Sequence, residues 1–582
     1  MDKKAIAGIL EEMGTLLEIQ GANPFKSRAF HNASRAVEGL TRDLPELVES
    51  GELLEVEGIG KSIAEIVTDL VKKGSSKEYT QLRKSFPDGI VDILKIQGLG
   101  PKKVKVLYEK LKITSLNELE QAARENRLAS IAGFGAKTEE NILKGIEALR
   151  RRSDKSLYPK AAEAAQRVYD AMMKRKEILR GEIAGSLRRR KEIIGDIDIV
   201  VSAKDASRPK LMDAFVSHPD VETVVAKGET KSSVVLKAGI SCDLRIVNEQ
   251  EFPFALNYFT GSKEHNVEMR SRAKKYGWSL NEYGFSEIGA EETRGKAKKV
   301  VKCKDEADIY EALDLVYVPP ELRENMGEIA VAGQGKLPKL LVDSDIRGTF
   351  HCHTTYSDGV NTLEEMTLAA KALGWEYLGI ADHSKVTAVY ANGLTEERVK
   401  EQFKEIDGLN NRLQGLRVFK GTECDILPNG DLDWSENVLA SFEYVVASVH
   451  SSFTMSGTEM TKRIIKAIKN KHVTMLGHPT GRILLGREGY AVDMIKVIDA
   501  AADYGKIIEI NSHPSRLDLD WRLCKYAKEK GVTIAINPDA HNREGLRDVF
   551  YGVGIARKGW LEKKDVLNAQ RLNGVLEYLQ IA

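Results

Sequence analysis

The sequence predicts a multidomain chain with an all-α N-terminal region, an α+β middle and a distorted α/β barrel of the TIM-like kind at the C-terminus. Three observations support this prediction. The 582 residues are too many for a single hydrophobic core. Amphipathic runs broken by Gly-x-Gly turns fill the first 150 residues. Eight of the eleven histidines lie beyond residue 320, and six of these stand at or near the ends of apolar runs typical of buried strands.

Composition and charge exclude several classes of protein. The formal net charge is only +1, and no apolar run reaches the length of a membrane span. The first residues, MDKKAIAGILEEMG, are typical of an amphipathic helix rather than a signal peptide. Five cysteines without paired spacing fit a reducing interior. We therefore expect a cytoplasmic protein that contacts no membrane, and we take a monomer as the default.

The charge is not spread evenly along the chain. Residues 151–320 carry 31 basic and 27 acidic side chains, whereas the preceding part is balanced and the following part is slightly acidic. A surplus of this size is common on solvated surfaces. It nevertheless makes the middle of the chain the most favourable place to hold a phosphate backbone.

Three related turns punctuate the N-terminal helices. They are Gly58-Ile59-Gly60, Gly98-Leu99-Gly100 and Gly133-Phe134-Gly135, and each precedes a new amphipathic run. Two glycines permit a tight hairpin and leave backbone N–H groups free at the start of the second helix, where they can bind phosphate. One such turn is usually only a connection. Three in one helical region resemble helix-hairpin-helix repeats that contact DNA without reading its sequence.

A pair of carboxylates lies in the strand-like segment of GEIAGSLRRRKEIIGDIDIVV. Asp196 and Asp198 alternate along it, so both project from one face and can share a divalent ion. Asp243, in SCDLRIV, lies on a later predicted strand that can pair beside the first. Gly185-Ser186 and the arginines at 188–190 could hold and neutralise a phosphate. A DxD pair alone is a weak signal, but three carboxylates around two ions suit in-line phosphoryl transfer.

With YFTGSKEHNVEMR following, residues 1–320 resemble the family X DNA polymerases, the group typified by DNA polymerase beta. The resemblance implies that Asp196, Asp198 and Asp243 form the catalytic triad of the palm with Mg²⁺ or Mn²⁺, and that Asp243 helps deprotonate the primer 3′ hydroxyl. It also implies contacts to the incoming nucleotide and the nascent base pair, from Gly185, Ser186, Arg189, Tyr258, Phe259, Gly261, Asn266 and Arg270. The DNA-contacting residues expected in the helical region are Lys26, Phe30, Gly58, Gly60, Lys61, Gly98, Gly100, Lys102 and Lys103.

The C-terminal part carries a second set of candidate metal ligands. The period of two in His351-Cys352-His353 points both imidazoles to one side of a strand. Asp382-His383 and Asp539-Ala540-His541 each follow an apolar run, and strand ends around a barrel are where α/β enzymes place their chemistry. Imidazole with carboxylate suits zinc, manganese or iron. Since no CxxC pair is present, a catalytic site is favoured over a structural one.

In order and spacing, HCHTTYSDG, ADHS, GTECD, SVHSS, GHPTGR and PDAH resemble the polymerase and histidinol phosphatase (PHP) domain. This resemblance implies three ions, Mn²⁺ or Zn²⁺, that hydrolyse phosphoesters. One ion would be held by His351, His353, Glu423 and Asp539, a second by Glu423, His450 and His478, and a third by Asp358, His383 and His541. The residues left over, Asp382, Asp425, His472 and His513, are as well explained by hydrogen bonding or surface exposure.

These resemblances divide the chain into six segments. We expect an N-terminal DNA-binding domain, a fingers-like domain, a nucleotidyltransferase palm, a thumb-like nucleotide-selection domain, a linker and a PHP domain, at residues 1–85, 86–150, 151–250, 251–318, 319–345 and 346–582 respectively. Prolines and glycines mark the linker, where the helix and strand patterns lapse. Such a linker would let the hydrolytic site move relative to the polymerase.

The favoured function is a DNA-repair enzyme with two opposed activities. Its palm would fill short gaps in gapped or nicked DNA with deoxynucleoside triphosphates. Its barrel would act as a 3′ to 5′ exonuclease that also processes abasic sites or blocked 3′ ends. The first alternative is a phosphoesterase whose N-terminal half is only a DNA-docking scaffold. The others are a small-molecule phosphatase of the histidinol phosphate type and a non-catalytic DNA-end-binding protein.

One departure from the family pattern yields a prediction. The position that carries the Schiff-base lysine for removal of a 5′ deoxyribose phosphate is Ile66 here, in GIGKSIAEI, and isoleucine cannot form an imine. We expect the protein to bind gaps without efficient lyase activity. Borohydride treatment of the protein on incised abasic DNA should trap almost no covalent adduct, whereas a strong adduct would contradict this expectation.

Overall fold

The computed structural model describes residues 3–38, 44–56, 58–87, 89–94, 96, 99–125, 127–131, 133–150, 155–288, 301–387 and 391–581. The chain forms two compact units, Met1–Leu149 and Arg150–Ala582, and each is described by itself. In the described part of the chain, no helix combines the length and apolar character needed to cross a membrane.

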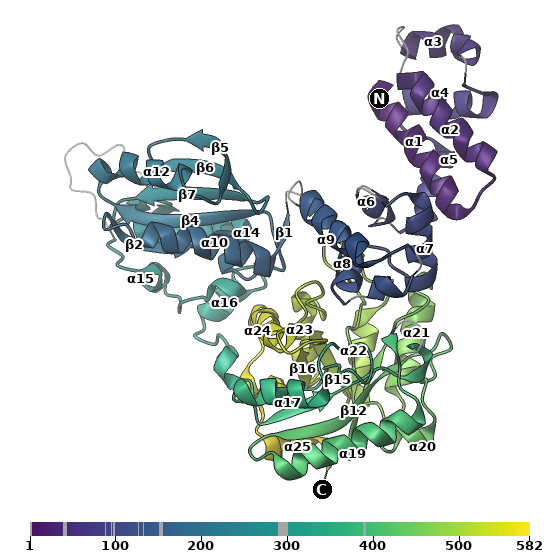
Figure 1. The fold of residues 1–582 in the computed structure, drawn as a ribbon. Helices are drawn as coiled ribbons and strands as arrows, with labels where there is room; N and C mark the ends of the chain where they lie inside the picture. Colours follow the sequence, from purple (N-terminus) through teal and green to yellow (C-terminus); the bar gives the residue numbers. More distant parts are fainter. Residues whose placement is uncertain are drawn as a thin grey trace. The chain divides into compact units, whose positions relative to one another are not determined.

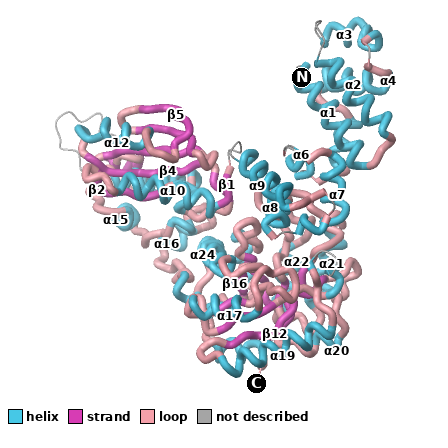
Figure 2. Tube along the Cα trace, viewed as in Figure 1, coloured by secondary structure: helices cyan, strands magenta, loops and turns pink. Residues whose placement is uncertain are grey.

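The first unit is all helical, as the sequence predicts (Figures 1 and 2). Its helices pack around two hydrophobic cores. The first group is α1 (Lys3–Gln20), α2 (Pro24–Glu38), α3 (Leu44–Ser50), α4 (Lys61–Lys73) and α5 (Lys77–Lys84). The second group is α6 (Gly89–Leu94), α7 (Pro101–Leu111), α8 (Leu116–Arg124) and α9 (Ala136–Arg150).

The predicted turns stand where new helices begin. Helices α4, α7 and α9 start directly after Gly60, Gly100 and Gly135. Neither Gly60 nor Gly100 supplies a side-chain cap, so the N–H groups in the first turn of α4, and in that of α7 after Pro101, stay available to a phosphate. Gly58 has a φ of +93°, a left-handed conformation that favours glycine. Gly98 lies outside the described residues.

One of the expected DNA-contacting side chains is a core residue instead. Phe30 is only 5% exposed and packs in the first helical core, so it stabilises that core rather than facing DNA. Lys26, Lys61 and Lys102 are exposed, whereas Lys103 is half-buried with Nζ 5.7 Å from the centroid of the Phe134 ring. The sequence shows that Phe30 lies on a helix but not which face of the helix meets its neighbours.

The second unit begins with a five-stranded sheet in the order β2-β4-β7-β6-β5. These strands are β2 (Ile178–Ile183), β4 (Asp196–Ala203), β5 (Val221–Lys227), β6 (Lys231–Leu236) and β7 (Ser241–Val247). Strands β4 and β7 are parallel, and the other pairs are antiparallel. Helices α10 (Tyr158–Met173) and α12 (Arg208–Val216) pack with Ile197, Ile199 and Val201 in one core. Because side chains alternate along a strand, Asp196 and Asp198 belong to the opposite face.

A smaller helical part follows the sheet. It contains α13 (Phe252–Thr260), α14 (Lys263–Lys275), the hairpin β8 (Trp278–Asn281) and β9 (Gly284–Glu287), α15 (Glu306–Glu311) and α16 (Glu328–Ala332). Two short strands, β1 (Ser156–Leu157) and β3 (Ile193–Ile194), pair antiparallel at the edge of the palm region.

The segment expected to be an irregular linker, residues 319–345, is packed rather than loose. It contains α16, and both Arg323 and Glu328 have 0% exposure. Arg323 Nη1 lies 2.7 Å from Glu306 Oε1, and Glu328 Oε1 lies 2.7 Å from His265 Nδ1. Buried charges persist only when they are paired. Arg323 and Glu328 of this segment therefore belong to the interior.

The rest of the second unit is a barrel of seven parallel strands that follow one another in chain order. They are β10 (Gly348–Thr349), β11 (Tyr377–Ile380), β12 (Arg417–Asp425), β13 (Tyr444–Ser448), β14 (Met475–Leu476), β15 (Ile507–Asn511) and β16 (Ile534–Asn537). A single parallel bridge between Cys352 and Ala540 joins the first and last strands, with His353 N donating to Ala540 O over 2.8 Å.

Helices cover the outside of the barrel. They are α17 (Leu363–Ala372), α19 (Glu396–Arg412), α20 (Glu436–Leu439), α21 (Gly457–Ile468), α22 (Met494–Asp503), α23 (Trp521–Glu529) and α24 (Val549–Lys558). The final helix, α25 (Leu572–Leu579), packs with Phe350, Tyr377, Phe419 and Tyr444 in a separate cluster. This closed, layered packing confirms the predicted α/β barrel and brings the carboxyl ends of the strands together.

The ring of Tyr444 leaves no room for a side chain at position 421. A Cβ at Gly421 would lie 2.1 Å from Tyr444 Cζ, inside the buried cluster. Gly421→Ala should therefore destabilise the barrel by about 1–3 kcal/mol through overpacking. Gly408→Ala is the matched control, because nothing lies within 4 Å of the added Cβ on α19.

Four of the five tryptophans lie in the barrel, so tryptophan fluorescence during thermal unfolding reports mainly on it. The Gly421 variant should unfold at a lower temperature, whereas the control should unfold at the wild-type temperature or slightly above. Equal midpoints for both variants would contradict the packing argument.

Candidate active sites in the palm and the barrel

The three palm carboxylates come from two neighbouring parallel strands. Asp196 and Asp198 lie on β4, and Asp198 stands directly beside Asp243 of β7 in the strand register. Burial and the neighbouring Asp196 and Asp243 carboxylates raise the pKa of Asp198 to about 6. Lys231 on β6 lies 2.6 Å from Asp243 Oδ2. Carboxylates that repel one another in this way form a ready site for divalent cations.

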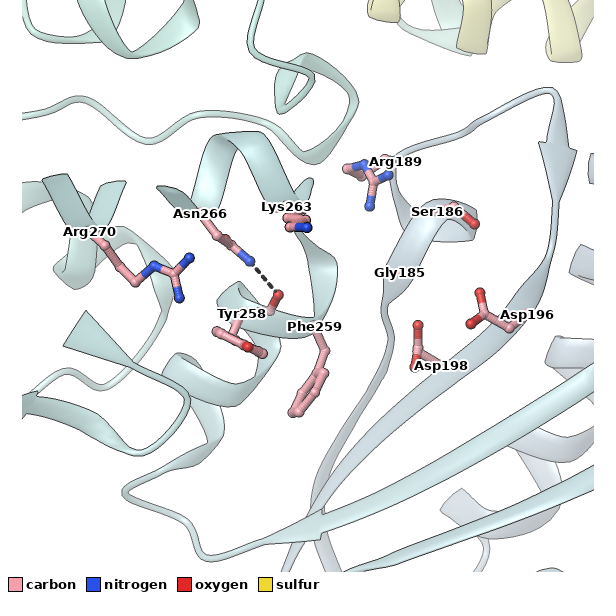
Figure 3. Close-up of a pocket in the computed structure, with 11 residues that line it drawn as sticks. Gly185, Ser186, Arg189, Asp196, Asp198, Tyr258, Phe259, Lys263, Asn266 and Arg270 are labelled. Atoms are coloured by element: carbon pink, nitrogen blue, oxygen red, sulfur yellow. Dashed lines mark hydrogen bonds between the residues drawn. The ribbon is translucent and has the colours of Figure 1, made fainter. Parts of the chain in front are cut away.

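A pocket of about 320 Å³ opens beside Asp196 and Asp198 (Figure 3). The residues that line it, apart from these two, are Gly185, Ser186, Arg189, Tyr258, Phe259, Gly261, Lys263, Asn266 and Arg270. All eight predicted nucleotide contacts are thus brought together. Asn266 Nδ2 donates to Tyr258 O over 2.7 Å, which ties α14 to the end of α13.

Lys263 is the pocket residue that sequence reasoning missed. It is the first residue of α14, where the preceding Ser262 caps the helix by accepting from His265 N. The signal was present in the sequence, because GSKEH places a cation at the first helical position, where an anion is usually favoured. A lysine there, together with the free N–H groups of the helix, suits a bound phosphate.

Each arginine of 188–190 faces a glutamate in the structure. Arg188 Nη2 lies 2.6 Å from Glu306 Oε2, and Arg189 Nε lies 3.0 Å from Glu324 Oε1. Arg190 Nε lies 3.8 Å from Glu321 Oε1. Only Arg189 lines the pocket. Of the three arginines expected to neutralise a phosphate, Arg189 is therefore the one that the structure places beside the pocket.

In the barrel, Glu423 of β12 is the centre of the candidate metal site. Its carboxylate is 1% exposed. Oε1 lies 2.9 Å from His478 Nε2 and 3.2 Å from His450 Nε2. Oε2 lies 3.3 Å from His351 Nε2 and 3.6 Å from His353 Nε2. The two oxygens thus face two different groups of imidazoles, as a bridging ligand requires.

The remaining predicted ligands complete two further groups. Asp539 Oδ1 lies 3.2 Å from His353 Nε2, next to His351. Asp358 Oδ1 lies 3.3 Å from His541 Nε2 and 3.7 Å from His383 Nε2. His353 and His383 each face two groups, since His353 Nδ1 also approaches Asp358 and His383 Nδ1 lies 3.0 Å from Glu423 Oε2. The three groups of ligands therefore overlap more than the resemblance implies.

The chemistry of these side chains fits metal ions. His351 Nε2, His353 Nε2 and His383 Nδ1 are buried without a hydrogen-bond partner, although carboxylate oxygens lie close by. Buried nitrogens of this kind call for a positive ion between them and the oxygens. Burial and the neighbouring His541 and His383 lower the pKa of His353 to about 3, which keeps it in the neutral form that binds metals.

Neighbouring charges, rather than burial, decide the direction in which the pKa values of Glu423, Asp539 and His450 shift. Burial alone would raise the pKa of Glu423 and of Asp539, but the surrounding imidazoles outweigh it and hold both well below the usual range. Burial would lower the pKa of His450, but Asp425 and Glu423 raise it to about 10. These carboxylates are therefore ionised and available as ligands.

A further shell of polar residues orients the ligands. Glu509 Oε1 lies 2.7 Å from His351 Nδ1, and its Oε2 accepts from His478 N over 2.6 Å. Sequence reasoning missed Glu509, although a carboxylate inside the apolar run KIIEIN was a signal. Arg516 was also missed, and its Nε lies 3.6 Å from Asp539 Oδ2.

The leftover residues of the sequence are hydrogen-bonded, as expected. Asp382 is fully buried and accepts from Thr354 N over 2.8 Å and from Gln402 Nε2 over 2.6 Å. Asp425 Oδ1 lies 3.2 Å from His450 Nδ1, so it orients a candidate ligand. His472 pairs with Glu436, and His513 with Ser515.

Comparison with known proteins agrees with this geometry. Family models match a helix-hairpin-helix domain at residues 1–76, a SAM-like helix-hairpin-helix tandem at 90–148, a DNA polymerase beta thumb at 255–324 and a PHP domain at 349–513. The chain is 37% identical over 582 residues to the DNA polymerase/3′-5′ exonuclease PolX of Bacillus subtilis, a match that covers 100% of both chains. This chain belongs to the PolX family.

Other relatives of this PolX-family chain match a smaller part of it. A protein of Thermoanaerobacter sp. named "Probable phosphatase" is 32% identical over 253 residues, which is 42% of this chain and 95% of that protein. A structure of Leishmania infantum polymerase beta in a ternary complex covers 40% of this chain and 99% of that chain, with 24% identity and a TM-score of 0.27. A TM-score this low supports no conclusion about the fold of this chain.

Glu509 should be needed for metal affinity in this PolX-family barrel. Glu509→Gln keeps the shape of the side chain but removes the charge that orients His351, so binding of Mn²⁺ by the barrel should weaken by about 10–100-fold. Metal-free protein that also carries Asp196→Ala, which disables the palm site, would be titrated with Mn²⁺ by calorimetry. Glu529→Gln, exposed on α23, is the control and should bind as before. Unchanged affinity in Glu509→Gln would refute the orienting role.

Proposed function

We propose that this protein is a DNA-directed DNA polymerase that fills short gaps and, at a second site, a metal-dependent 3′ to 5′ exonuclease. The observation that carries the proposal is that the barrel gathers clusters of metal-competent side chains, and that Asp196, Asp198 and Asp243 stand on neighbouring strands of the palm, in a chain that matches PolX over its whole length. We further propose that the exonuclease site processes abasic sites or blocked 3′ ends, and that both activities serve DNA repair.

In the palm, Asp196, Asp198 and Asp243 would hold Mg²⁺ or Mn²⁺. Such ions lower the pKa of the attacking hydroxyl and stabilise the leaving pyrophosphate. Asp243 stands beside Asp198 and would accept the proton of the primer 3′ hydroxyl. Ser186 and Arg189 lie across the pocket from Tyr258 and Asn266, so the triphosphate would bind on one side and the sugar and base on the other (Figure 3).

In the barrel, the clustered histidines and carboxylates would hold up to three ions, Mn²⁺ or Zn²⁺. Bound ions of this kind supply a nucleophile at neutral pH and neutralise the charge of a phosphodiester. Glu509, Asp425 and Asp382 would keep the ligands in place through the contacts described above. Arg516, 17% exposed and beside Asp539, would face the phosphate of the DNA 3′ end.

The partners follow from these roles. Gapped or nicked DNA and deoxynucleoside triphosphates would be the substrates of the palm. Lys26, Lys61, Lys102, Gly58 and Gly100 are proposed to contact the DNA backbone. We also propose a cytoplasmic monomer, with the domain limits given for the sequence.

The phosphatase-named relatives support a narrower alternative, in which the barrel is the sole enzyme. The carboxylates argue against it, because a docking scaffold has no use for Asp196 and Asp198 at a pocket that Ser186, Arg189 and Lys263 also line, with Asp243 on the strand beside them.

A primer-extension assay separates the two sites. On a one-nucleotide gapped duplex with a 5′-labelled primer and Mn²⁺, Asp243→Ala should lose extension and keep shortening, because only the palm loses a ligand. His351→Ala should lose shortening and keep extension. Loss of a catalytic carboxylate or ligand is expected to cost at least about 100-fold in rate. A wild-type protein that shortens the primer but never extends it with deoxynucleotides would refute the polymerase assignment.

A further inference from the structure

A buried lysine of the barrel reaches the polymerase side of the second unit. Lys558 is the last residue of α24, and its side chain has 0% exposure. Its Nζ lies 2.5 Å from Glu324 Oε1 and donates to the carbonyl oxygen of Arg189 over 3.0 Å and to that of Glu321 over 3.4 Å. All three acceptors precede the barrel in the chain, so the ammonium group of Lys558 donates its hydrogen bonds to the polymerase part of the second unit.

The acceptor carboxylate also holds a residue of the nucleotide pocket. Glu324 Oε1, which binds Lys558, accepts from Arg189 Nε over 3.0 Å. Arg189 Nη1 donates to the carbonyl oxygen of Thr260 at the end of α13. Among the described residues, Nη2 of Arg189 has no hydrogen-bond partner. Two of its three nitrogens therefore fix the guanidinium, and the third remains for a ligand in the pocket it lines.

The charges of this cluster do not cancel. Burial lowers the pKa of Lys558 to about 8, so it is still protonated at neutral pH. Burial would raise the pKa of Glu324, but the charges of Lys558 and Arg189 outweigh it and lower that pKa. Two cations thus share the Glu324 carboxylate, and Glu192 also acts on Lys558. The free Nη2 of Arg189 stands at the pocket wall, where an anionic phosphate would pair with it.

We propose that Lys558 is a positioning residue for nucleotide binding, acting from the barrel through Glu324 on Arg189. The proposal rests on the polymerase function proposed above. Without Lys558, Glu324 would pair with Arg189 alone, and the guanidinium would satisfy the carboxylate rather than the triphosphate. With Lys558 in place, the carboxylate is already neutralised and Arg189 keeps its charge for the nucleotide.

The loop around Arg189 lies against the same helix. The Arg190 side chain packs on Gly554 of α24, where an added Cβ would lie 3.0 Å from Arg190 Cδ. Arg557 Nε donates to Glu321 Oε1 over 2.8 Å. Arg482, from another part of the barrel, has Nη2 3.5 Å from Glu192 Oε1. The loop that presents Arg189 is therefore supported by the barrel at several points.

Lys558→Met tests the proposal, because it keeps the length of the side chain and removes the charge. The apparent KM for the incoming deoxynucleotide in gap filling should rise by about ten-fold, with kcat within about two-fold of wild type. Shortening of a primer without deoxynucleotides should be unchanged, which shows that the barrel is folded. Lys563→Met is the matched control: its Nζ pairs with Asp345 at 3.2 Å, is half-exposed and lies on the same domain.

A double-mutant cycle with Arg189→Ala separates positioning from a general structural effect. If Lys558 acts through Arg189, Lys558→Met should add no further rise in KM to the Arg189→Ala protein. An equal rise in both backgrounds, or an unchanged KM in the single variant, would overturn the proposal. Should Lys558→Met lose primer shortening through misfolding, Lys558→Gln takes its place: its amide can still donate to the carbonyl oxygens of Arg189 and Glu321 but carries no charge, so KM should rise in the same way. A wild-type protein without any extension would refute the polymerase function itself, a distinct result.

Discussion

The burial of the Glu423 carboxylate is the constraint around which the barrel is arranged. A charge that is 1% exposed must be balanced locally, since water cannot solvate it. Five imidazoles lie within 3.6 Å of its two oxygens, and they come from the ends of four strands. His351 and His353 follow β10, and His383, His450 and His478 follow β11, β13 and β14. Parallel strands in chain order, closed by the single Cys352–Ala540 bridge, are what bring those ends to one place.

The palm solves a different electrostatic problem. There the like charges of Asp196, Asp198 and Asp243 are held together by strand register, and their repulsion is stored until cations arrive. Lys231, 2.6 Å from Asp243, and Arg245 relieve part of it, whereas the arginines at 188–190 face glutamates of the following segment. One site therefore gathers opposite charges and the other gathers mainly like charges, and both arrangements suit divalent ions.

Strand periodicity and motif spacing predicted where most of the candidate metal ligands of the palm and the barrel lie. Alternation placed Asp196 and Asp198 on one face, and the apolar runs before His383 and Asp539 placed the ligands at strand ends. What the sequence could not supply was the partner of each buried charge. Arg323, Glu328 and Lys558 resemble surface residues until the distant groups that neutralise them are known. The prediction that Phe30 contacts DNA was wrong for a related reason: helical periodicity does not show which neighbouring helix covers a given face.

The shared carboxylate of Glu324 also bears on how this chain can be divided. A fragment that ended before residue 346 would keep Glu324 and Arg189 but lose the ammonium group that shares the Glu324 carboxylate with Arg189, and it would expose Glu321 and the surface that meets α24. The polymerase half, expressed alone, would thus be a protein with a differently charged nucleotide pocket. Its kinetic constants would describe that altered pocket and could not be assigned to the intact enzyme.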